Sequence, residues 1–189
     1  ATHANRRTGA GRPRRRWSPH LSTRLSVAIR PIRVFGDPVL RTASEVIRPG
    51  DARASALVED LLDSVRVPGR AGVAACQIGV SLRAFSFNVE GEVGYILNPV
   101  LVEVRGEPES TEEGCLSVPG FFFPRMRHPW ARVTGVDLEG SPIELSGEGL
   151  MAQALQHEMD HLEGHLYIEG LDKETKREAM RLIRESTWF

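Results

Sequence analysis

Two histidines four positions apart are the residues of this 189-residue chain whose spacing points most directly to chemistry. The segment QHEMDH at 156–161 carries His157 and His161, with Glu158 directly after the first histidine. On an α-helix, positions i and i+4 share one face about 6 Å apart, so the two imidazoles could bind one metal ion. Glu158 would sit to the side of that pair, within reach of a water on the metal. The arrangement predicts metal-assisted hydrolysis; two ordinary core histidines are the structural alternative.

The two histidines share a face only if the residues around them form a helix. Between 149 and 163 apolar residues recur at helical spacing, and the segment contains neither proline nor a β-branched residue. Residues 146–148 suit the start of a helix, and Gly164 suits its end. We therefore expect a buried helix at 149–163, with His165 beyond its end and outside the ligand set.

A third ligand is needed, because a catalytic metal usually takes three protein ligands and leaves one position for water. Cys115 is our candidate. It lies in EGCLS at 113–117, where Gly114 lets the backbone come close, and its thiolate suits zinc or ferrous iron. Glu178 and Glu185 follow the histidines, but both fit a solvated helix face better.

Three separated segments resemble the signature motifs of the peptide deformylase family. They are GVAACQ at 72–77, EGCLS at 113–117 and QHEMDH at 156–161, in the order and approximate spacing of that family. The resemblance covers about residues 31–185. It implies removal of the formyl group from the N-terminal formyl-methionine of nascent polypeptides, with release of formate.

The resemblance also implies a role for each matching residue. It implies one divalent metal ion, Fe²⁺ in the native protein with Zn²⁺ or Ni²⁺ as substitutes, and three ligands: Cys115, His157 and His161. Glu158 matches the general acid/base for attack on the formyl carbon by hydroxide from the metal's water. The Gln77 side chain and the Leu116 backbone N–H match the donors to the formyl oxygen. For Gln77, a loop amide bonded to the backbone is the structural alternative.

Substrate-binding positions follow from the same segments. Gly72 matches a glycine beside the bound peptide backbone, and we expect further contacts from neighbouring positions and from the metal helix: Ala71, Val73, Gly114, Leu150 and Ala154. Arg70 and Ala71 depart from the family pattern of glycine and a larger aliphatic residue, which predicts a roomier methionine pocket. The segment GFFFP at 120–124 replaces a substrate-binding arginine. Its three phenylalanines are either an apolar lip for the nascent chain or core residues, and we expect core.

Composition excludes several classes of protein. Hydrophobic residues make up 41% and charged residues 26%, as in globular domains. No apolar run approaches the roughly 18 residues that a membrane span requires. Two cysteines exclude a disulfide-dense scaffold and indicate a reducing compartment. We expect Cys76 to be structural.

The charge is strongly asymmetric. Residues 1–33 hold nine of the 24 basic side chains, which leaves 15 basic against all 25 acidic ones in the rest. We expect residues 1–30 to be a disordered basic extension and residues 31–189 to form a single catalytic domain. The extension reads as an organellar transit peptide, an RNA-contacting arm or an inert addition. A bacterial cytoplasm is the expected location, and an organelle follows only if the extension is a cleaved address.

The order of the expected elements predicts an α+β fold. Helices are expected at 51–66 and 172–185. Strands are expected at 82–88, 95–97, 100–104 and about 109–115, with a hairpin of 132–138 and 142–145. We expect short-stranded, mostly antiparallel sheets packed around a central metal-binding helix, with an N-terminal and a C-terminal helix.

Two other functions compete with deformylation. A metallopeptidase of the HExxH type would cleave internal peptide bonds, but Cys115 and Gln77 argue against it. A ribosome- or RNA-binding protein with a structural metal would need the basic extension and not Glu158. The expected partners are formyl-methionyl nascent peptides and the ribosome near its exit tunnel, with no membrane and no requirement for direct nucleic-acid binding.

Overall fold

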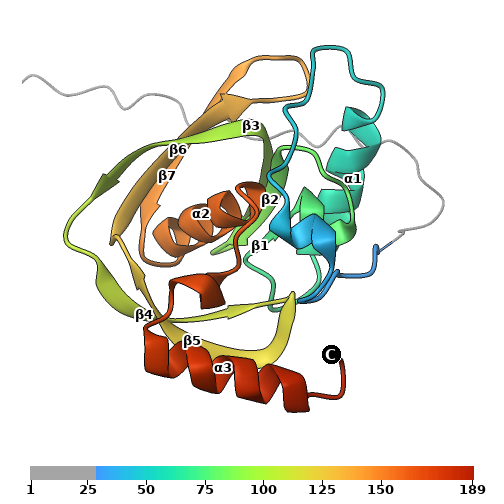
Figure 1. The fold of residues 1–189 in the computed structure, drawn as a ribbon. Coiled ribbons are helices and arrows are strands. Elements are labelled where there is room, and N and C mark those ends of the chain that lie inside the picture. The colour runs from blue at the N-terminus through green and yellow to red at the C-terminus, as the bar shows by residue number, and fades with distance from the viewer. Residues whose placement is uncertain (1–28) are drawn as a thin grey trace, which may run out of the picture.

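The computed structural model describes residues 29–189. Residues 1–28 lie outside the described part of the chain. The predicted disorder of the basic extension, and the three roles suggested for it, therefore stay predictions. Within that part, antiparallel strands form two sheets, and helices pack around them (Figure 1). The predicted α+β class is confirmed. That residues 31–189 act as one catalytic domain stays a prediction.

The larger sheet has five antiparallel strands in the order β1-β2-β3-β6-β7. Their bounds are Gly72–Ala74, Ala84–Val89, Glu92–Arg105, Trp130–Val136 and Pro142–Glu148. β3 is one continuous strand, so the prediction of two strands there is wrong. Asn98, between the two predicted strands, takes φ 49° and exchanges side-chain hydrogen bonds with the Ile47 backbone, while the strand continues past it.

The smaller sheet pairs β4 (Glu109–Cys115) with β5 (Val118–Arg127). β4 agrees with the predicted strand, whereas β5 is absent from the predicted elements because glycine, proline and a phenylalanine run obscure its alternation. Successive side chains point to opposite faces. Glu113 and Phe123 are cross-strand partners on the inner, buried face, and Gly114 and Phe122 are partners on the outer face.

Helix α2 (Gly149–Leu162) runs through the middle of the molecule, between the two sheets (Figure 1). One side buries Leu155, Met159 and Leu162 against the five-stranded sheet. His157, Asp160 and His161 face the smaller sheet, where they contact Glu113, Arg127 and Cys115. The predicted central helix and its limits are confirmed to within one residue.

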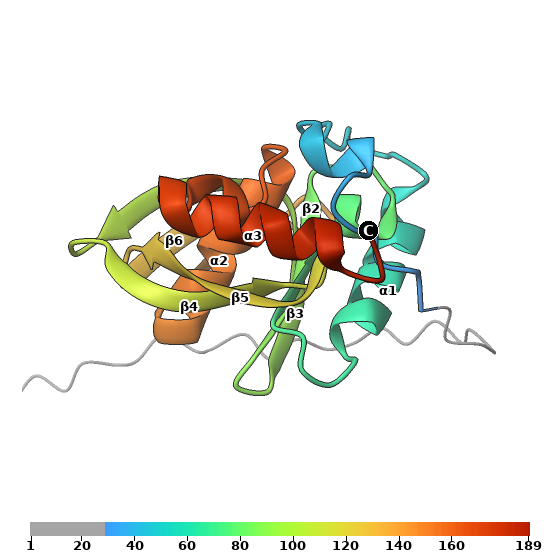
Figure 2. The ribbon, with the colours of Figure 1, turned by 60° about the horizontal axis from the view of Figure 1, so that its bottom comes forward.

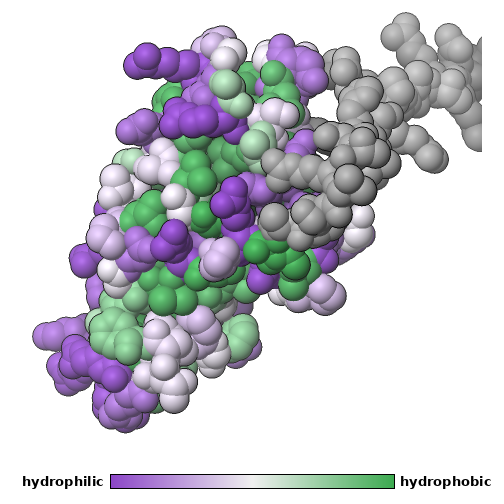
Figure 3. All heavy atoms as spheres, turned by 90° about the vertical axis from the view of Figure 1, so that its right-hand side faces the viewer, coloured by the Kyte–Doolittle hydropathy of each residue, from purple (hydrophilic) through white to green (hydrophobic). Residues whose placement is uncertain are grey.

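Two further α-helices cover the outside. α1 (Ala54–Val65) packs on β1 and β2, and Asp51 accepts a hydrogen bond from the backbone N–H of Arg53 just before it. Hydrophilic and apolar side chains are interspersed on the side of the molecule that carries α1 (Figure 3). α3 (Lys173–Glu185) begins at Asp172, which accepts from the backbone of the first turn, and it packs along β5 (Figure 2). No helix within residues 29–189 is long and apolar enough to cross a bilayer.

Candidate metal centre and active site

The three predicted ligands lie together between α2 and the end of β4. Cys115 Sγ is 3.3 Å from His161 Nε2, which is 3.1 Å from His157 Nε2. One ligand atom from each residue lies within 4.8 Å of the others. The helical spacing of the histidines therefore has the predicted effect, and β4 brings the cysteine to them from 42 positions upstream of His157. A soft sulfur and two imidazoles form a donor set that suits a divalent transition metal.

The hydrogen bonds behind these ligands prepare them for a cation. His157 Nδ1 lies 2.7 Å from Glu113 Oε1. A carboxylate can only accept, so Nδ1 carries the proton and the lone pair of Nε2 faces the cluster. The backbone N–H of Ser117 and the Gln77 amide both donate to Cys115 Sγ, at 3.4 Å and 3.6 Å. The residues present thus fit a bound divalent metal.

Glu113 is itself held by a buried arginine that the sequence analysis did not identify. Arg127 contacts both carboxylate oxygens, at 2.9 Å and 2.6 Å, and donates to Asp160 at 2.8 Å. Burial raises the pKa of Glu113, but the bonds from Arg127 and His157 outweigh it and hold that pKa at about 2. No sequence signal identified this pair, because Glu113 and Arg127 share a face only through the register of β4 with β5, a strand that was not predicted.

Glu158 has an environment suited to proton transfer. Its side chain is 2% exposed, and its Oε2 has no hydrogen-bond partner among the described residues. Burial raises the pKa of Glu158 to about 7. A carboxyl group with that pKa can take up and release a proton near neutral pH. Gly72 lies directly against this carboxylate, where any side chain would collide with it.

Gln77 lies beside Cys115 in space, and Leu116 follows it in the chain. The Gln77 side chain is buried, and its Oε1 accepts from the Ala74 backbone N–H at 3.0 Å. That bond turns the NH₂ group toward Cys115 Sγ and the Ser117 hydroxyl. The Gln77 amide is therefore bonded to the backbone through its oxygen, as in the structural alternative. Its NH₂ group is nevertheless directed at the candidate ligand Cys115. Leu116 follows Cys115 in the turn between β4 and β5.

Distant segments hold the chain where it leaves Cys115. Ser117 O accepts from the Phe35 backbone N–H at 2.8 Å, and Pro119 O accepts from Trp188 Nε1 at 3.0 Å. Phe121 O accepts from the Tyr167 hydroxyl at 2.9 Å. These three contacts come from both ends of the described chain, so the position of the cysteine turn depends on the whole fold.

The predicted substrate residues of β1 divide into two groups. Asn88 N–H donates to Ala71 O, so by alternation Ala71 and Val73 bond to β2 while the N–H and C=O of Gly72 point to the other edge. That edge has no partner strand among the described residues. Val73 is fully buried in the core, so its side chain does not reach the cluster, contrary to its predicted substrate contact. Ala71 is half-buried.

Leu150 lines a hollow of about 540 Å³ beside Thr111, Arg127 and Gln153. Ala154, one turn further along α2 toward His157, is buried and is not part of that lining. Gly114 adjoins Cys115 at the end of β4.

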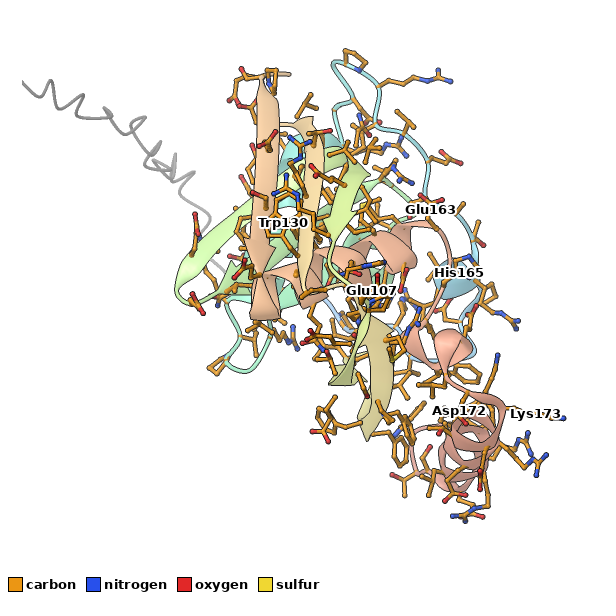
Figure 4. The ribbon with its side chains drawn as sticks, turned by 90° about the vertical axis from the view of Figure 1, so that its left-hand side faces the viewer. Glu107, Trp130, Glu163, His165, Asp172 and Lys173 are labelled. Carbon is orange, nitrogen blue, oxygen red and sulfur yellow. The ribbon has the colours of Figure 1, made fainter. Side chains whose placement is uncertain are left out.

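Two residues set aside by the sequence analysis lie where it expected them. His165 follows the end of α2, is exposed and lies 2.9 Å from Glu169 through its Nδ1 (Figure 4). It takes no part in the cluster. Cys76 is buried, with its Sγ 3.6 Å from the carbonyl oxygen of His161.

Comparisons with known proteins agree with this geometry. Residues 29–177 match the family model described as polypeptide deformylase. A peptide deformylase of Acidothermus cellulolyticus is 45% identical over 162 residues, covering 86% of this chain and 89% of that protein. One from Mycobacterium sp. (strain JLS) is 43% identical over 179 residues, covering 86% of this chain and 91% of that protein.

Solved structures agree as well. The crystal structure of a peptide deformylase from Legionella pneumophila superposes with a TM-score of 0.77 at 37% identity, over 84% of this chain and 95% of that one. That from Thermus thermophilus gives a TM-score of 0.76 at 36% identity, over 83% and 94% of the two chains. With the sequence, the fold and the Cys-His-His cluster in agreement, this chain belongs to the peptide deformylase family of hydrolases.

Proposed function

We propose that this chain hydrolyses the formyl group from the N-terminal formyl-methionine of nascent polypeptides and releases formate. The observation that carries the proposal is the meeting of Cys115, His157 and His161 beside an unpartnered Glu158 carboxylate. The Gln77 amide on the other side of Cys115 adds a donor for the reacting oxygen.

Cys115, His157 and His161 would hold one divalent metal ion. We propose Fe²⁺ as the native ion, with Zn²⁺ or Ni²⁺ as functional substitutes, since thiolate and imidazole suit all three. When bound, such an ion lowers the pKa of a coordinated water from 15.7 to about 7 and polarises a carbonyl oxygen. Glu113 fixes the orientation of His157 through its 2.7 Å contact, and Arg127 fixes Glu113.

Glu158 moves the proton. It accepts a proton from the attacking water as the oxygen bonds to the formyl carbon. It then delivers this proton to the amine nitrogen as the C–N bond breaks, so formate and a free N-terminal amine leave. Its raised pKa suits both steps, and burial in the core keeps bulk water from competing for the proton.

Gln77 and Leu116 stabilise the negative charge that develops on the formyl oxygen. The Gln77 NH₂ is already oriented by the Ala74 backbone, so it loses little freedom during the reaction. The Leu116 backbone N–H is the second donor. A preorganised donor of this kind contributes about 3 kcal/mol to the transition state.

The peptide would bind in extended form between two unpaired strand edges. Gly72 offers its N–H and C=O at the edge of β1, and β4 has a second open edge within the described residues. Gly72 lets the peptide backbone approach Glu158. The methionine side chain would point inward, toward Leu150 and the hollow it lines. Ala71 and Ala154 stay predicted contacts outside that lining.

We propose that the protein works in a bacterial cytoplasm on chains leaving the ribosome, as the bacterial sources of its relatives suggest. A location in an organelle would require that the basic segment be a cleaved address. Neither a membrane nor direct contact with nucleic acid is needed for the reaction.

The test is a formate assay on formyl-Met-Ala-Ser with anaerobically purified, metal-analysed protein. We expect one metal ion per chain and formate release, with no cleavage of casein. Glu158→Gln should keep the metal and lose activity by about 10²–10⁴-fold. Casein cleavage without formate release would favour a metallopeptidase and refute the proposal.

A further inference from the structure

Phe122 differs from the phenylalanines on either side of it. Phe123 is 9% exposed and packs in the core, and Phe121 packs against Trp188 with ring centroids 6.3 Å apart. Phe122, between them, is 64% exposed on the outer face of β5. The expectation that all three are core residues therefore fails for the middle one, and its exposed aromatic ring requires another explanation.

The Phe122 ring lies over Gly114, its cross-strand partner in β4. A Cβ built on Gly114 would come within 2.5 Å of this ring, so the ring occupies the space that a side chain would fill. Gly114 directly precedes Cys115 and lies next to the open edge of β4. The ring thus covers the residue before Cys115, and Gly114 places no side chain between the ring and the open edge of β4.

An extended peptide at this edge would bring one of its side chains to the ring. Adjacent strands lie about 4.8 Å apart, and side chains of neighbouring strands on one face touch. Across the bare Gly114, the next side chain on the outer face would belong to the bound peptide. If the methionine side chain points inward, alternation directs the following residue outward.

We propose that Phe122 selects the residue directly after the formyl-methionine, favouring an apolar side chain over a polar one of the same size. This inference rests on the proposed deformylase function and adds a substrate preference to it. The occupant of the apolar surface over Gly114 is the second residue of the peptide substrate, because Gly114 directly precedes Cys115 and lies in β4, whose open edge the peptide would pair with.

The test compares kcat/KM for formyl-Met-Leu-Ser and formyl-Met-Asn-Ser, which are uncharged and similar in size. We expect the wild-type protein to prefer leucine by about tenfold, the range that apolar and aromatic contacts give. Phe122→Ala should bring the ratio close to one, and Phe122→Leu should keep most of it. Met126→Ala is the matched control, since Met126 is 51% exposed on the same face but pairs with Ser110, away from the cleft.

An unchanged ratio in Phe122→Ala, or an equal loss in Met126→Ala, would overturn the inference. Equal kcat/KM for both peptides in the wild type would overturn it and leave the proposed function standing. No formate from either peptide would overturn both. Should Phe122→Ala fail to fold, Phe122→Gln must lose the preference that Phe122→Leu retains.

Discussion

The inner and outer faces of the β4–β5 sheet are built from alternating residues of the same two strands, yet they carry opposite chemistry. The inner face holds Cys115 and the paired charges Glu113 and Arg127, which are 3% and 6% exposed. The outer face carries Gly114 and exposed apolar residues such as Phe122 and Met126. Charge is thus buried and apolar surface is exposed, the reverse of the usual distribution.

A two-stranded sheet can therefore carry buried charge on one face and exposed apolar side chains on the other. On the inner face, the two buried charges are paired: Arg127 contacts Glu113 and Asp160, and Glu113 contacts His157. A buried charge is tolerable only with such pairing. On the outer face the apolar side chains need no such pairing, and there we propose Phe122 as a contact for the substrate. A shift of register by one residue would exchange the two faces.

The largest loss of metal affinity should come from replacing Cys115 on the inner face. Cys115→Ala removes a predicted ligand, so metal affinity should fall by more than the roughly 100-fold that loss of a hydrogen bond behind a ligand costs. Formate release should fall with it. Equilibrium dialysis against Zn²⁺ measures the affinity, and a variant that binds metal as the wild type does would refute the ligand assignment.

Glu113→Gln should have the next largest effect. It leaves Arg127 buried without its anionic partner and removes the acceptor behind His157, so metal affinity should drop by about 10–100-fold. The metal-stripped protein should also lose roughly 3 kcal/mol of unfolding free energy. Glu112→Gln, the adjacent residue on the exposed outer face, is the matched control. Equal losses in the two variants, by chelator competition and urea unfolding, would remove the distinction between the faces.

The pH dependence of stability should show whether the charge of the Glu113 carboxylate stabilises the inner face. The folded pKa of Glu113 is about 2, below its ordinary value of 4.5. Its contribution is therefore fully present above pH 4.5 and is lost as the pH falls toward 2. After metal removal, the stability difference between wild type and Glu113→Gln should narrow over that range. A difference that stays constant with pH would mean that the carboxylate charge is not what stabilises the inner face.

The smallest effect should come from the outer face away from the cleft. Met126→Ala removes an exposed side chain, so the unfolding free energy should change by no more than about 0.5 kcal/mol. Metal affinity should stay at the wild-type value in the same dialysis experiment. A loss comparable to that of Glu113→Gln would show that the outer face supports the metal site.

Sequence reasoning succeeded where spacing along one element determines position. His157, Glu158 and His161 follow from helical periodicity alone, and α2 forms where apolar periodicity and the absence of helix breakers place it. Cys115 could be predicted as a ligand only because two histidines do not complete a catalytic metal site and because its segment resembles a family motif. It reaches the histidines only because β4 pairs with β5, a strand that the sequence did not predict.

The parts that sequence reasoning missed depend on tertiary pairing. Arg127 lies on the unpredicted strand, so its contacts with Glu113 and Asp160 could not be anticipated from spacing. Val73 was taken as a substrate residue from its place in a motif, but alternation in β1 turns its side chain into the core. Alternation in a strand decides which side chains face the candidate site and which face the core, and it can be assigned only when the pairing register is known.

The most direct test of the account measures bound metal and released formate on the same samples of wild type and Glu158→Gln. We expect one divalent metal ion per chain in both proteins, and formate from formyl-Met-Ala-Ser in the wild type alone. Wild-type protein that holds its metal but releases no formate, or a Glu158→Gln variant that releases it at the wild-type rate, would contradict the central claim.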